Sequence, residues 1–286
     1  MLQVARLSRA ALGESADLVQ SFIRSQMNAD GGFQNRAGES DLYYTVFGVE
    51  SLIALQAEPP IERITNYLGR FGDGDSLDFV HLACLGRCWA GVSRTLKDVP
   101  IDGILARVEQ FRAPDGGYNQ TPDSTDGTAY AAFLAMGVYQ DLGREVPNSD
   151  RLLRNLHSLR AEDGGFSNFA VASAGLTPAT AAVVTLMRQF GCDPDEALAA
   201  WLLARALPSG GFFAIPDAPI PDLLSTATAL HALSGLRVPL NGLREPCLDF
   251  IDSLWTNRGG FFGHWSDDAI DTEYTYYALL SLGHLA

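Results

Sequence analysis

Apolar positions along this chain follow two kinds of helical pattern that alternate from end to end. In residues 14–28 the apolar side chains recur every three or four positions, which predicts a helix with one buried face. Residues 42–55 are apolar nearly all round, and a helix of that kind is buried on every side. The one-faced pattern returns near residues 61–70, 101–113, 149–160, 194–206 and 243–256. The all-round pattern returns near residues 77–91, 126–140, 178–190, 222–235 and 271–285.

A turn with two glycines and an aromatic residue comes between the two helices of each pair, as in Asp30-Gly31-Gly32-Phe33. The other turns of this kind begin at Gly116, Gly164, Gly210 and Gly259. They recur at intervals of roughly 46 to 49 residues, and such a fixed period is typical of a repeat architecture. The first interval is nearly twice as long, so we expect a degenerate unit at Phe71-Gly72-Asp73-Gly74-Asp75.

Six helical hairpins are enough to close a circle instead of forming an open solenoid. The sequence therefore predicts an all-α protein, an (α/α)6 barrel or α-α toroid, with residues 1–286 as a single domain. The all-round apolar helices form the inner ring and the one-faced helices the outer ring. We expect the inner helices to be parallel, so that they all begin at one mouth of the barrel. Period-2 alternation is almost absent, and we expect no substantial sheet.

Charge and cysteine content narrow the classes of partner. The net charge of −14 argues against nucleic acid and anionic lipid, because both are bound through Lys and Arg. The four cysteines show neither CxxC spacing nor a disulfide-rich pattern, which fits a reducing compartment. No stretch of 18 apolar residues is present, so we expect no membrane span. The first residues lack the apolar run of a secretory signal, and we expect a cytoplasmic protein.

Carboxylates stand at the predicted starts of the inner helices. These are Asp41, Asp78, Asp126, Asp222 and Asp271, with Glu273 two residues after the last. Aspartate is a preferred N-cap residue, which accounts for each position on its own. Gathered at one mouth, however, like charges raise the pKa of a neighbouring carboxyl group and keep a proton available near neutrality. We therefore take Asp41, Asp126, Asp222, Asp271 and Glu273 as candidate catalytic residues.

Aromatic side chains cluster in the first turns of the inner helices. An aromatic wall suits an apolar ligand and stabilises a carbocation by cation–π attraction. Ordinary packing between the two rings accounts for part of the set. We expect Tyr44, Phe47, Tyr274 and Tyr277 to line a central pocket. The candidate ligand-binding residues are Tyr43, Tyr44, Phe47, His81, Tyr130, Tyr274 and Tyr277.

One face of the second inner helix carries three residue types that bind metal ions: Asp78, His81 and Cys84. The first and last lie roughly 9 Å apart along the helix axis, so a single ion would need help from another helix. A hydrogen-bonded histidine beside a small buried cysteine explains the same pattern. We assign no cofactor, and a divalent ion, Zn²⁺ or Mg²⁺, stays open as an alternative.

The repeat resembles that of protein prenyltransferase β subunits and squalene-cyclase-type terpenoid cyclases. The resemblance covers most of the chain and rests on the glycine turns followed by Asp41 and Tyr44-Thr45-x-Phe47, and by Asp271 and Tyr274-Thr275-x-Tyr277. It implies an (α/α)6 barrel whose central apolar cavity holds an isoprenoid chain. For the prenyltransferases it also implies a helical partner subunit, which this chain alone does not reveal.

The resemblance also implies site residues from which this chain departs. The positions that match the zinc ligands of the prenyltransferases are Asp222, Leu224 and Tyr274, of which only Asp222 is a usual ligand. The loop at 214–221, which matches a basic diphosphate-binding loop, has no Arg or Lys. The Asp-x-Asp-Asp motif of the cyclases is present only in fragments, as Asp73-x-Asp75 and Asp267-Asp268.

Three functions remain open at this point. The first is a prenyltransferase-like protein that binds an isoprenoid or other apolar small molecule in a central cavity, as a transferase or cyclase with an altered site. The second is a non-catalytic barrel that binds a lipid or peptide. The third is a carbohydrate-active (α/α)6 enzyme with paired carboxylates. We also predict that, in the absence of Mg²⁺, a neutral or cationic isoprenoid binds better than a prenyl diphosphate, because the acidic mouth repels the diphosphate unless a divalent cation bridges them.

Overall fold

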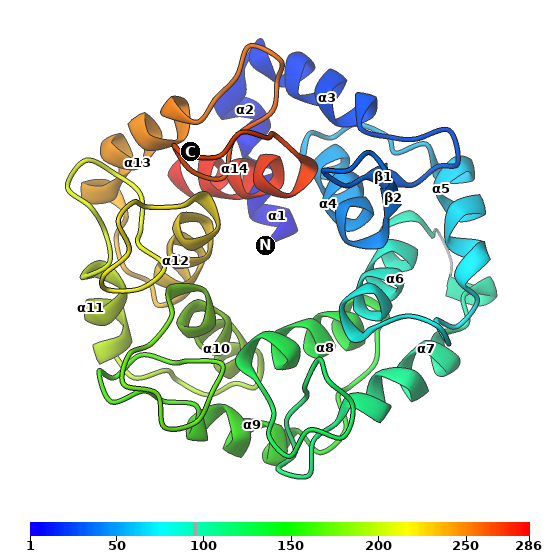
Figure 1. The fold of residues 1–286 in the computed structure, drawn as a ribbon. Helices are drawn as coiled ribbons and strands as arrows, with labels where there is room; N and C mark the ends of the chain where they lie inside the picture. The colour runs from blue at the N-terminus through cyan, green and yellow to red at the C-terminus, as the bar shows by residue number, and fades with distance from the viewer. Residues whose placement is uncertain (94–95) are drawn as a thin grey trace.

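The computed structural model describes residues 1–93 and 96–286 and shows two concentric rings of helices (Figure 1). The inner ring consists of α4 (Leu42–Ala54), α6 (Phe79–Val92), α8 (Ala129–Asp141), α10 (Thr177–Gln189), α12 (Leu223–Gly235) and α14 (Thr272–Leu285). The outer ring consists of α3 (Ser15–Ser25), α5 (Ile61–Leu68), α7 (Ile101–Val108), α9 (Ser149–Ser158), α11 (Ala197–Leu203) and α13 (Asn241–Ser253). The predicted α-α toroid of alternating helices is therefore confirmed.

The remaining elements are short. Two helices, α1 (Leu2–Ala5) and α2 (Ser8–Leu12), precede the first outer helix, and α1 packs against α4 and α14 near the axis of the ring (Figure 1). Strands β1 (Phe33–Gln34) and β2 (Ser40–Asp41) pair antiparallel in the first glycine turn. Three 3-10 helices complete the described chain: Gly69–Phe71, Leu96–Asp98 and Glu109–Phe111.

In four of the five complete glycine turns, the aromatic residue anchors an inner helix to the outer ring. Phe33, Phe166, Phe212 and Phe261 are buried, and in each case the backbone N–H donates to a threonine hydroxyl one turn into the following inner helix. The acceptors are Thr45, Thr180, Thr226 and Thr275. This bond explains the threonine in the repeated motif, because it satisfies a buried N–H that has left the helical ladder. Leu82 stands at this position in α6, in agreement with a degenerate second unit.

Successive inner helices begin at the same end of the barrel. The N–H of Thr177 at the start of α10 donates to the carbonyl of Ala214, and the N–H of Leu223 at the start of α12 donates to the carbonyl of Gly263. Each acceptor lies in the loop that leads into the next inner helix. At the closure, the Thr272 hydroxyl donates to the carbonyl of Tyr44, 3.0 Å away. The inner helices are thus parallel, and their N-termini surround one mouth, which we call the upper mouth.

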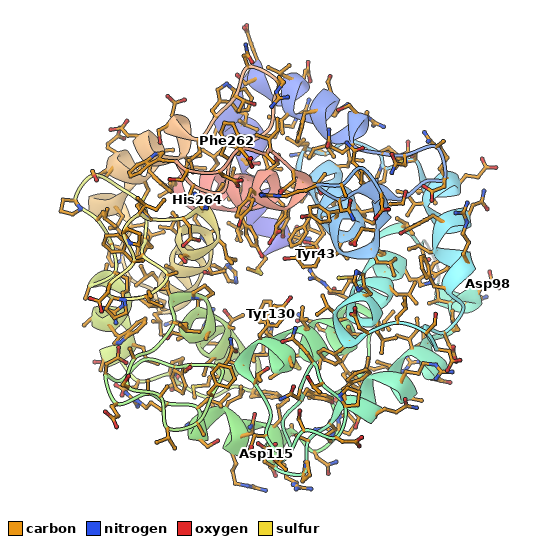
Figure 2. All side chains as sticks on the ribbon, in the orientation of Figure 1. Tyr43, Asp98, Asp115, Tyr130, Phe262 and His264 are labelled. Atoms are coloured by element: carbon orange, nitrogen blue, oxygen red, sulfur yellow. The ribbon has the colours of Figure 1, made fainter. Side chains whose placement is uncertain are left out.

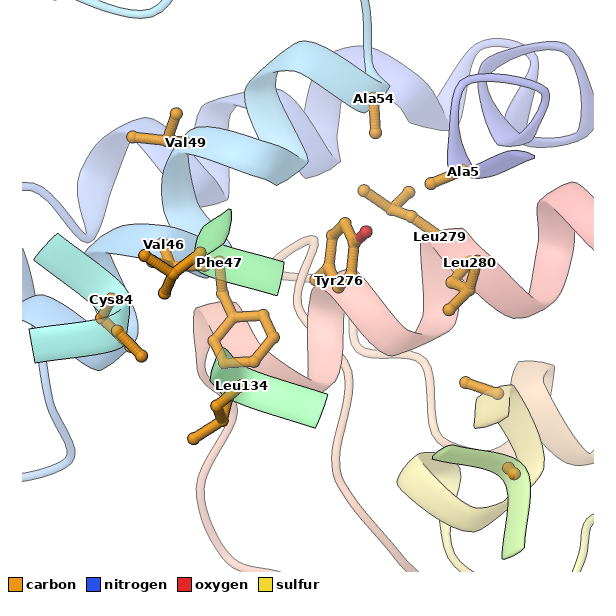
Figure 3. Close-up of a cluster of buried hydrophobic side chains, with 14 of the residues drawn as sticks. Ala5, Val46, Phe47, Val49, Ala54, Cys84, Leu134, Tyr276, Leu279 and Leu280 are labelled. Carbon is orange, nitrogen blue, oxygen red and sulfur yellow. The ribbon is translucent and has the colours of Figure 1, made fainter. Parts of the chain in front are cut away.

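The core lies between the two rings and between neighbouring inner helices. Figure 3 shows Val46, Phe47 and Tyr276 packed where α4 meets α14, with Leu134 of α8 beside them. Burial of large apolar side chains on both sides of each inner helix explains why these helices are apolar nearly all round. No helix in the described part of the chain has the length and apolar character needed to cross a membrane.

Candidate functional site

A cavity of about 350 Å³ opens inside the upper half of the inner ring. Its wall is unequal: α4, α8 and α14 contribute aromatic rings, whereas α10 and α12 contribute small side chains such as Ala181, Ala182 and Thr228. The small residues leave the space that the rings do not fill. A cavity of this size, with an apolar wall and few polar groups, is typical of a site for a small molecule.

Each inner helix places the second residue after its N-cap at the upper mouth. Tyr43, Tyr130, Pro178 and Leu224 hold this position after the caps Asp41, Thr128, Leu176 and Asp222, and all four line the cavity. Figure 2 shows Tyr43 and Tyr130 at the central opening. In α14 the same position after the cap Asp271 is Glu273. Glu273 is not itself part of the cavity wall, so a carboxyl group lies beside a layer of otherwise uncharged side chains.

Glu273 is bonded to the aromatic wall. The hydroxyl of Tyr43 donates to Oε1 of Glu273 at 2.6 Å, across the junction of α4 and α14. Burial raises the pKa of Glu273 to about 7, and this effect outweighs the bond from Tyr43, which lowers it. The nearby Asp271 carboxylate raises the pKa further. The group is thus able to carry a proton at neutral pH, with burial as the main cause instead of the crowding of carboxylates expected from the sequence.

Four carboxylates of the upper mouth are paired with cations: those of Asp41, Asp78, Asp267 and Asp271. His81 of α6 lies between two of them, with Nδ1 2.7 Å from Oδ2 of Asp78 and Nε2 3.3 Å from Oδ2 of Asp41. These two bonds raise the pKa of His81 to about 9 despite its partial burial, so that the ring is a cation at neutral pH. The same bonds lower the pKa values of Asp41 and Asp78, although burial acts in the opposite direction.

Arg36, in the turn between β1 and β2, pairs with the last carboxylates of the ring. Its Nε donates to Asp271 at 2.8 Å, and its terminal nitrogens donate to both oxygens of Asp267 at 3.0 and 2.9 Å. Both aspartate side chains are almost fully buried. No local pattern in the sequence singles out Arg36, because its partners are more than 230 positions away.

The remaining candidate carboxylates serve the helix ends. Asp222 caps α12, accepting from the N–H and the hydroxyl of Ser225, both at 2.7 Å. Asp126 is not a cap: α8 begins after Thr128, whose hydroxyl accepts from the N–H of Ala131. The exposed carboxylate of Asp126 accepts instead from the hydroxyl of Thr125. The expectation of an aspartate cap on this helix is therefore wrong, since threonine two positions later provides the same bond.

Four of the predicted aromatic residues line the cavity: Tyr43, Phe47, Tyr130 and Tyr277. The cavity wall does not include Tyr44, Tyr274 or His81, which lie at the rim. The ring of Tyr274 covers Gly263 and stacks below Arg36, whose guanidinium carbon is 5.6 Å from the ring centre. The expectation that Tyr44 and Tyr274 line the pocket is wrong, because in α4 the residue that faces the lumen is Tyr43, one position earlier, and in α14 the ring of Tyr274 packs against Gly263.

The residues that match the prenyltransferase zinc ligands do not fit a zinc ion. Both oxygens of Asp222 are bonded to Ser225, Leu224 is part of the apolar wall, and Tyr274 is held by Arg36 and Gly263. Asp78 and His81 are in contact, but Cys84 faces the cavity, and burial raises its pKa to about 12 and keeps it a thiol. Within residues 1–93 and 96–286, no group of three or more His, Cys, Asp and Glu side chains is arranged to hold a metal ion.

Comparison with known proteins identifies relatives of this architecture. A family model, the prenyltransferase alpha-alpha toroid domain, matches residues 7–81, 76–213 and 206–286. No curated protein sequence matches the chain.

Among solved structures, the type II terpene cyclase MstE from Scytonema is similar over 98% of this chain and 97% of its own. A variant of it without ligand has 13% identity and a TM-score of 0.70. Another variant, in complex with its substrate geranylgeranyl dihydroxybenzoate, has 12% identity, the same coverage and a TM-score of 0.69. Protein geranylgeranyltransferase-I of Candida albicans, complexed with GGPP, has 14% identity and a TM-score of 0.53 over 98% of this chain and 83% of its own. At these identities the likeness concerns the fold.

Proposed function

The chain belongs to the prenyltransferase alpha-alpha toroid family, and from this premise we propose that it binds an isoprenoid in the upper cavity and protonates one of its double bonds through Glu273. The observation that carries the proposal is the bond between Glu273 and the cavity wall: a carboxyl group with a pKa of about 7 accepts from the hydroxyl of Tyr43, which lines the aromatic cavity. A carbon–carbon double bond is a very weak base, so its protonation needs an acid in a site from which water is largely excluded.

Tyr43 connects the carboxyl group with the cavity. When Glu273 is protonated, its O–H donates to the phenolic oxygen of Tyr43, and the Tyr43 hydrogen is free to point into the lumen. In the reaction the Tyr43 hydrogen goes to one alkene carbon while the Glu273 proton goes to the Tyr43 oxygen. The π electrons form the new C–H bond, and the other alkene carbon becomes a carbocation. Glu273 is left as the carboxylate and is protonated again from solvent.

The aromatic wall is placed to stabilise that cation. Phe47 and Tyr277 lie beside Tyr43, with ring centres 5.0 Å apart for Tyr43 and Phe47 and 5.5 Å apart for Phe47 and Tyr277. A cation over the face of such a ring gains about 0.5–2 kcal/mol, more when it is desolvated. The lumen thus offers an acid at the mouth and electron-rich faces below it.

The MstE complex and the geranylgeranyltransferase complex both contain geranylgeranyl groups, which supports an isoprenoid as the ligand class for this fold. Two further observations favour acid chemistry over prenyl transfer. Transfer from a diphosphate, however, needs cations at the leaving group. The loop at 214–221 has no basic residue, and the zinc positions do not fit a metal ion.

Binding is tested by calorimetric titration with geranylgeraniol and with geranylgeranyl diphosphate in the absence of Mg²⁺. We expect the alcohol to bind and the diphosphate to bind more weakly. Ala182→Trp should abolish binding because the indole fills the space beside α10, whereas Ala200→Trp, on the exposed side of α11, should not change it. Equal binding by both variants would contradict a ligand site in the cavity.

The acid is tested by Glu273→Gln, which keeps the shape of the side chain and removes the acidic proton. This variant should bind geranylgeraniol with the affinity of the wild type and leave it unconverted, whereas the wild type should yield an isomer with fewer double bonds. If the wild type binds geranylgeraniol but converts it at no pH between 5 and 8, the result favours a non-catalytic barrel.

A further inference from the structure

A second chamber, of about 420 Å³, lies below the upper cavity, near the C-terminal ends of α4, α6, α8 and α10. The two share wall residues, among them Val46, Phe133, Thr185 and Tyr276, so the lower chamber adjoins the upper cavity. The lower chamber differs in character from the upper one, because charged and polar side chains line it. The polar residues are Glu50, Arg87, Gln140, Asp141, Gln189 and His231.

Four polar side chains of the lower chamber lie at the same position along their inner helices. Glu50, Arg87, Thr185 and His231 each lie nine residues after the cap of their helix, at Asp41, Asp78, Leu176 and Asp222. Tyr43 and Leu224 lie two residues after the cap in two of these helices. The polar layer is therefore seven residues below the layer of Glu273, about 10 Å along the helix axes. A ligand that reaches both layers must be apolar over most of its length and polar at its lower end.

Three of the hydrogen-bond donors of the lower chamber are already engaged. Arg87 pairs with Glu50, and its Nε donates to Oδ2 of Asp141 at 3.2 Å. The Thr185 hydroxyl donates to the carbonyl of Ala181 at 2.9 Å, within its own helix. The Gln189 amide donates to Gln140 at 3.0 Å. Met1 and Gln3 also line the chamber, and burial lowers the pKa of the Met1 α-amino group, which favours its uncharged form.

His231 is the acceptor that faces the lumen with an unbonded nitrogen. Its Nδ1 lies 3.0 Å from Nε2 of His284, and the described residues form no hydrogen bond to its Nε2. Burial lowers the pKa of His231 to about 3 and that of His284 to about 4, so both rings are neutral. One hydrogen lies between the two bonded nitrogens and belongs to one ring or the other. When Nδ1 of His231 carries that hydrogen, its Nε2 is a free acceptor.

Resting on the proposed function, we propose that the lower chamber binds the uncharged hydroxyl head group of the isoprenoid. The hydroxyl donates its hydrogen to Nε2 of His231, and the prenyl chain extends upward to Glu273. The charges of the chamber exclude the alternatives. The carboxylates of Glu50 and Asp141 already face the guanidinium of Arg87, and burial favours the uncharged form of the Met1 α-amino group in the same chamber, so a carboxylate or phosphate head would be buried without a cation of its own. A cationic head would have to compete with Arg87 for the same carboxylates.

The test compares three ligands that share one prenyl chain: geranylgeraniol, its methyl ether and geranylgeranoic acid as the anion at pH 7.5. The ether keeps the oxygen and cannot donate. We expect it to bind the wild type about tenfold more weakly than the alcohol, the equivalent of 1.4 kcal/mol. We expect the anion to bind more weakly still. If His231 carried its hydrogen on Nε2 instead, the ether would bind as well as the alcohol, and the proposal would be wrong.

Two variants separate the hydrogen bond from the charge. His231→Leu should lower the affinity for the alcohol to that for the ether and leave the affinity for the ether unchanged. His157→Leu, on the exposed face of α9, is the matched control and should change neither. Glu50→Gln removes a negative charge and should raise the affinity for the anion several-fold, with a smaller effect on the alcohol.

The outcomes distinguish this proposal from the one on which it rests. If no prenyl ligand binds the wild type, both are contradicted. If the alcohol and the ether bind equally well, to the wild type and to His231→Leu alike, the isoprenoid site stands and the head-group site is contradicted. Should His231→Leu fail to fold, the ratio of the two affinities in the wild type still decides.

Discussion

At the scale of single residues, the upper mouth shows how one motif position takes different chemical roles. Asp41 and Asp271 are equivalent caps, yet Asp41 pairs with His81 and Asp271 pairs with Arg36. Glu273, in contrast, bonds only to a neutral phenol, so its environment favours the protonated form. Burial also raises the pKa of Asp271, but there the bond and the charge of Arg36 act in the opposite direction, whereas no cation bonds to Glu273 among the described residues.

The raised pKa of Glu273 has a consequence for stability. In the unfolded chain this group titrates near its ordinary value, and in the folded protein near 7. The contribution of the neutral group is complete below pH 4.5 and is lost as the pH rises through 7. Glu273→Gln, which cannot ionise, should therefore gain stability relative to the wild type between pH 5 and 8, on the order of 2 kcal/mol. Urea unfolding across this range measures the difference, and parallel pH profiles of the two proteins would show that Glu273 titrates normally.

At the scale of the helical hairpin, the glycine turn is the element that joins neighbouring units. Gly259 has φ +91° and lies against the carbonyl of Leu18 in α3, so the last turn rests on the first outer helix. Gly31 lies in the same way against the backbone of α5. A Cβ at either position would overlap that carbonyl oxygen, so the first glycine is required for close approach as well as for its backbone angle.

Gly259→Ala separates these two requirements when it is compared with Gly143→Ala. Gly143 also has a positive φ, +68°, but a Cβ there would meet no neighbour within 4 Å. We expect Gly143→Ala to cost about 1 kcal/mol from backbone strain alone, and Gly259→Ala to cost about 3 kcal/mol or more, because α3 must also move. Denaturant unfolding measures both. Equal costs would mean that the contact with α3 contributes nothing.

The sequence was sufficient to predict the helices, but it predicted the residues of the candidate site only in part. Period and burial pattern predicted the twelve principal helices, because each inner helix packs on both sides and each outer helix on one side. The motif placed Tyr44 and Tyr274 correctly at the start of their helices, but which side of a first turn faces the lumen depends on how the inner helices are rotated about their axes. The polar side chains of the lower chamber were not predicted for a related reason. Glu50 and Arg87 look like isolated charges in the sequence, and they face one chamber only when α4, α6 and α8 pack side by side.

At the scale of the whole molecule, ring closure is the feature that no single repeat contains. α14 packs against α4, and Arg36 of the first unit holds Asp267 and Asp271 of the last. The same bridge connects the fold to the site, since Glu273 lies two residues beyond Asp271 and bonds to Tyr43 of the first inner helix. Opening of this junction would separate Glu273 from Tyr43.

Arg36→Met tests the closure. It leaves two buried carboxylates without their cation, which should lower the free energy of unfolding by about 3 kcal/mol at pH 7. The loss should be smaller at pH 4, where the carboxylates take up protons. Arg70→Met removes an exposed pair with Asp30 and should cost less than about 1 kcal/mol. The same small cost for both variants would show that the bridge does not hold the ring closed.

Proton delivery by Glu273 to an isoprenoid in the lumen is tested by incubation with geranylgeraniol in D2O, followed by mass spectrometry of the product. If Glu273 delivers the proton, the wild type gives a product with a deuterium bound to carbon. Tyr43→Phe should form it at least tenfold more slowly, and Glu273→Gln should not form it at all. A wild-type product without carbon-bound deuterium, or equal incorporation by Glu273→Gln, would contradict the role of Glu273 as the acid.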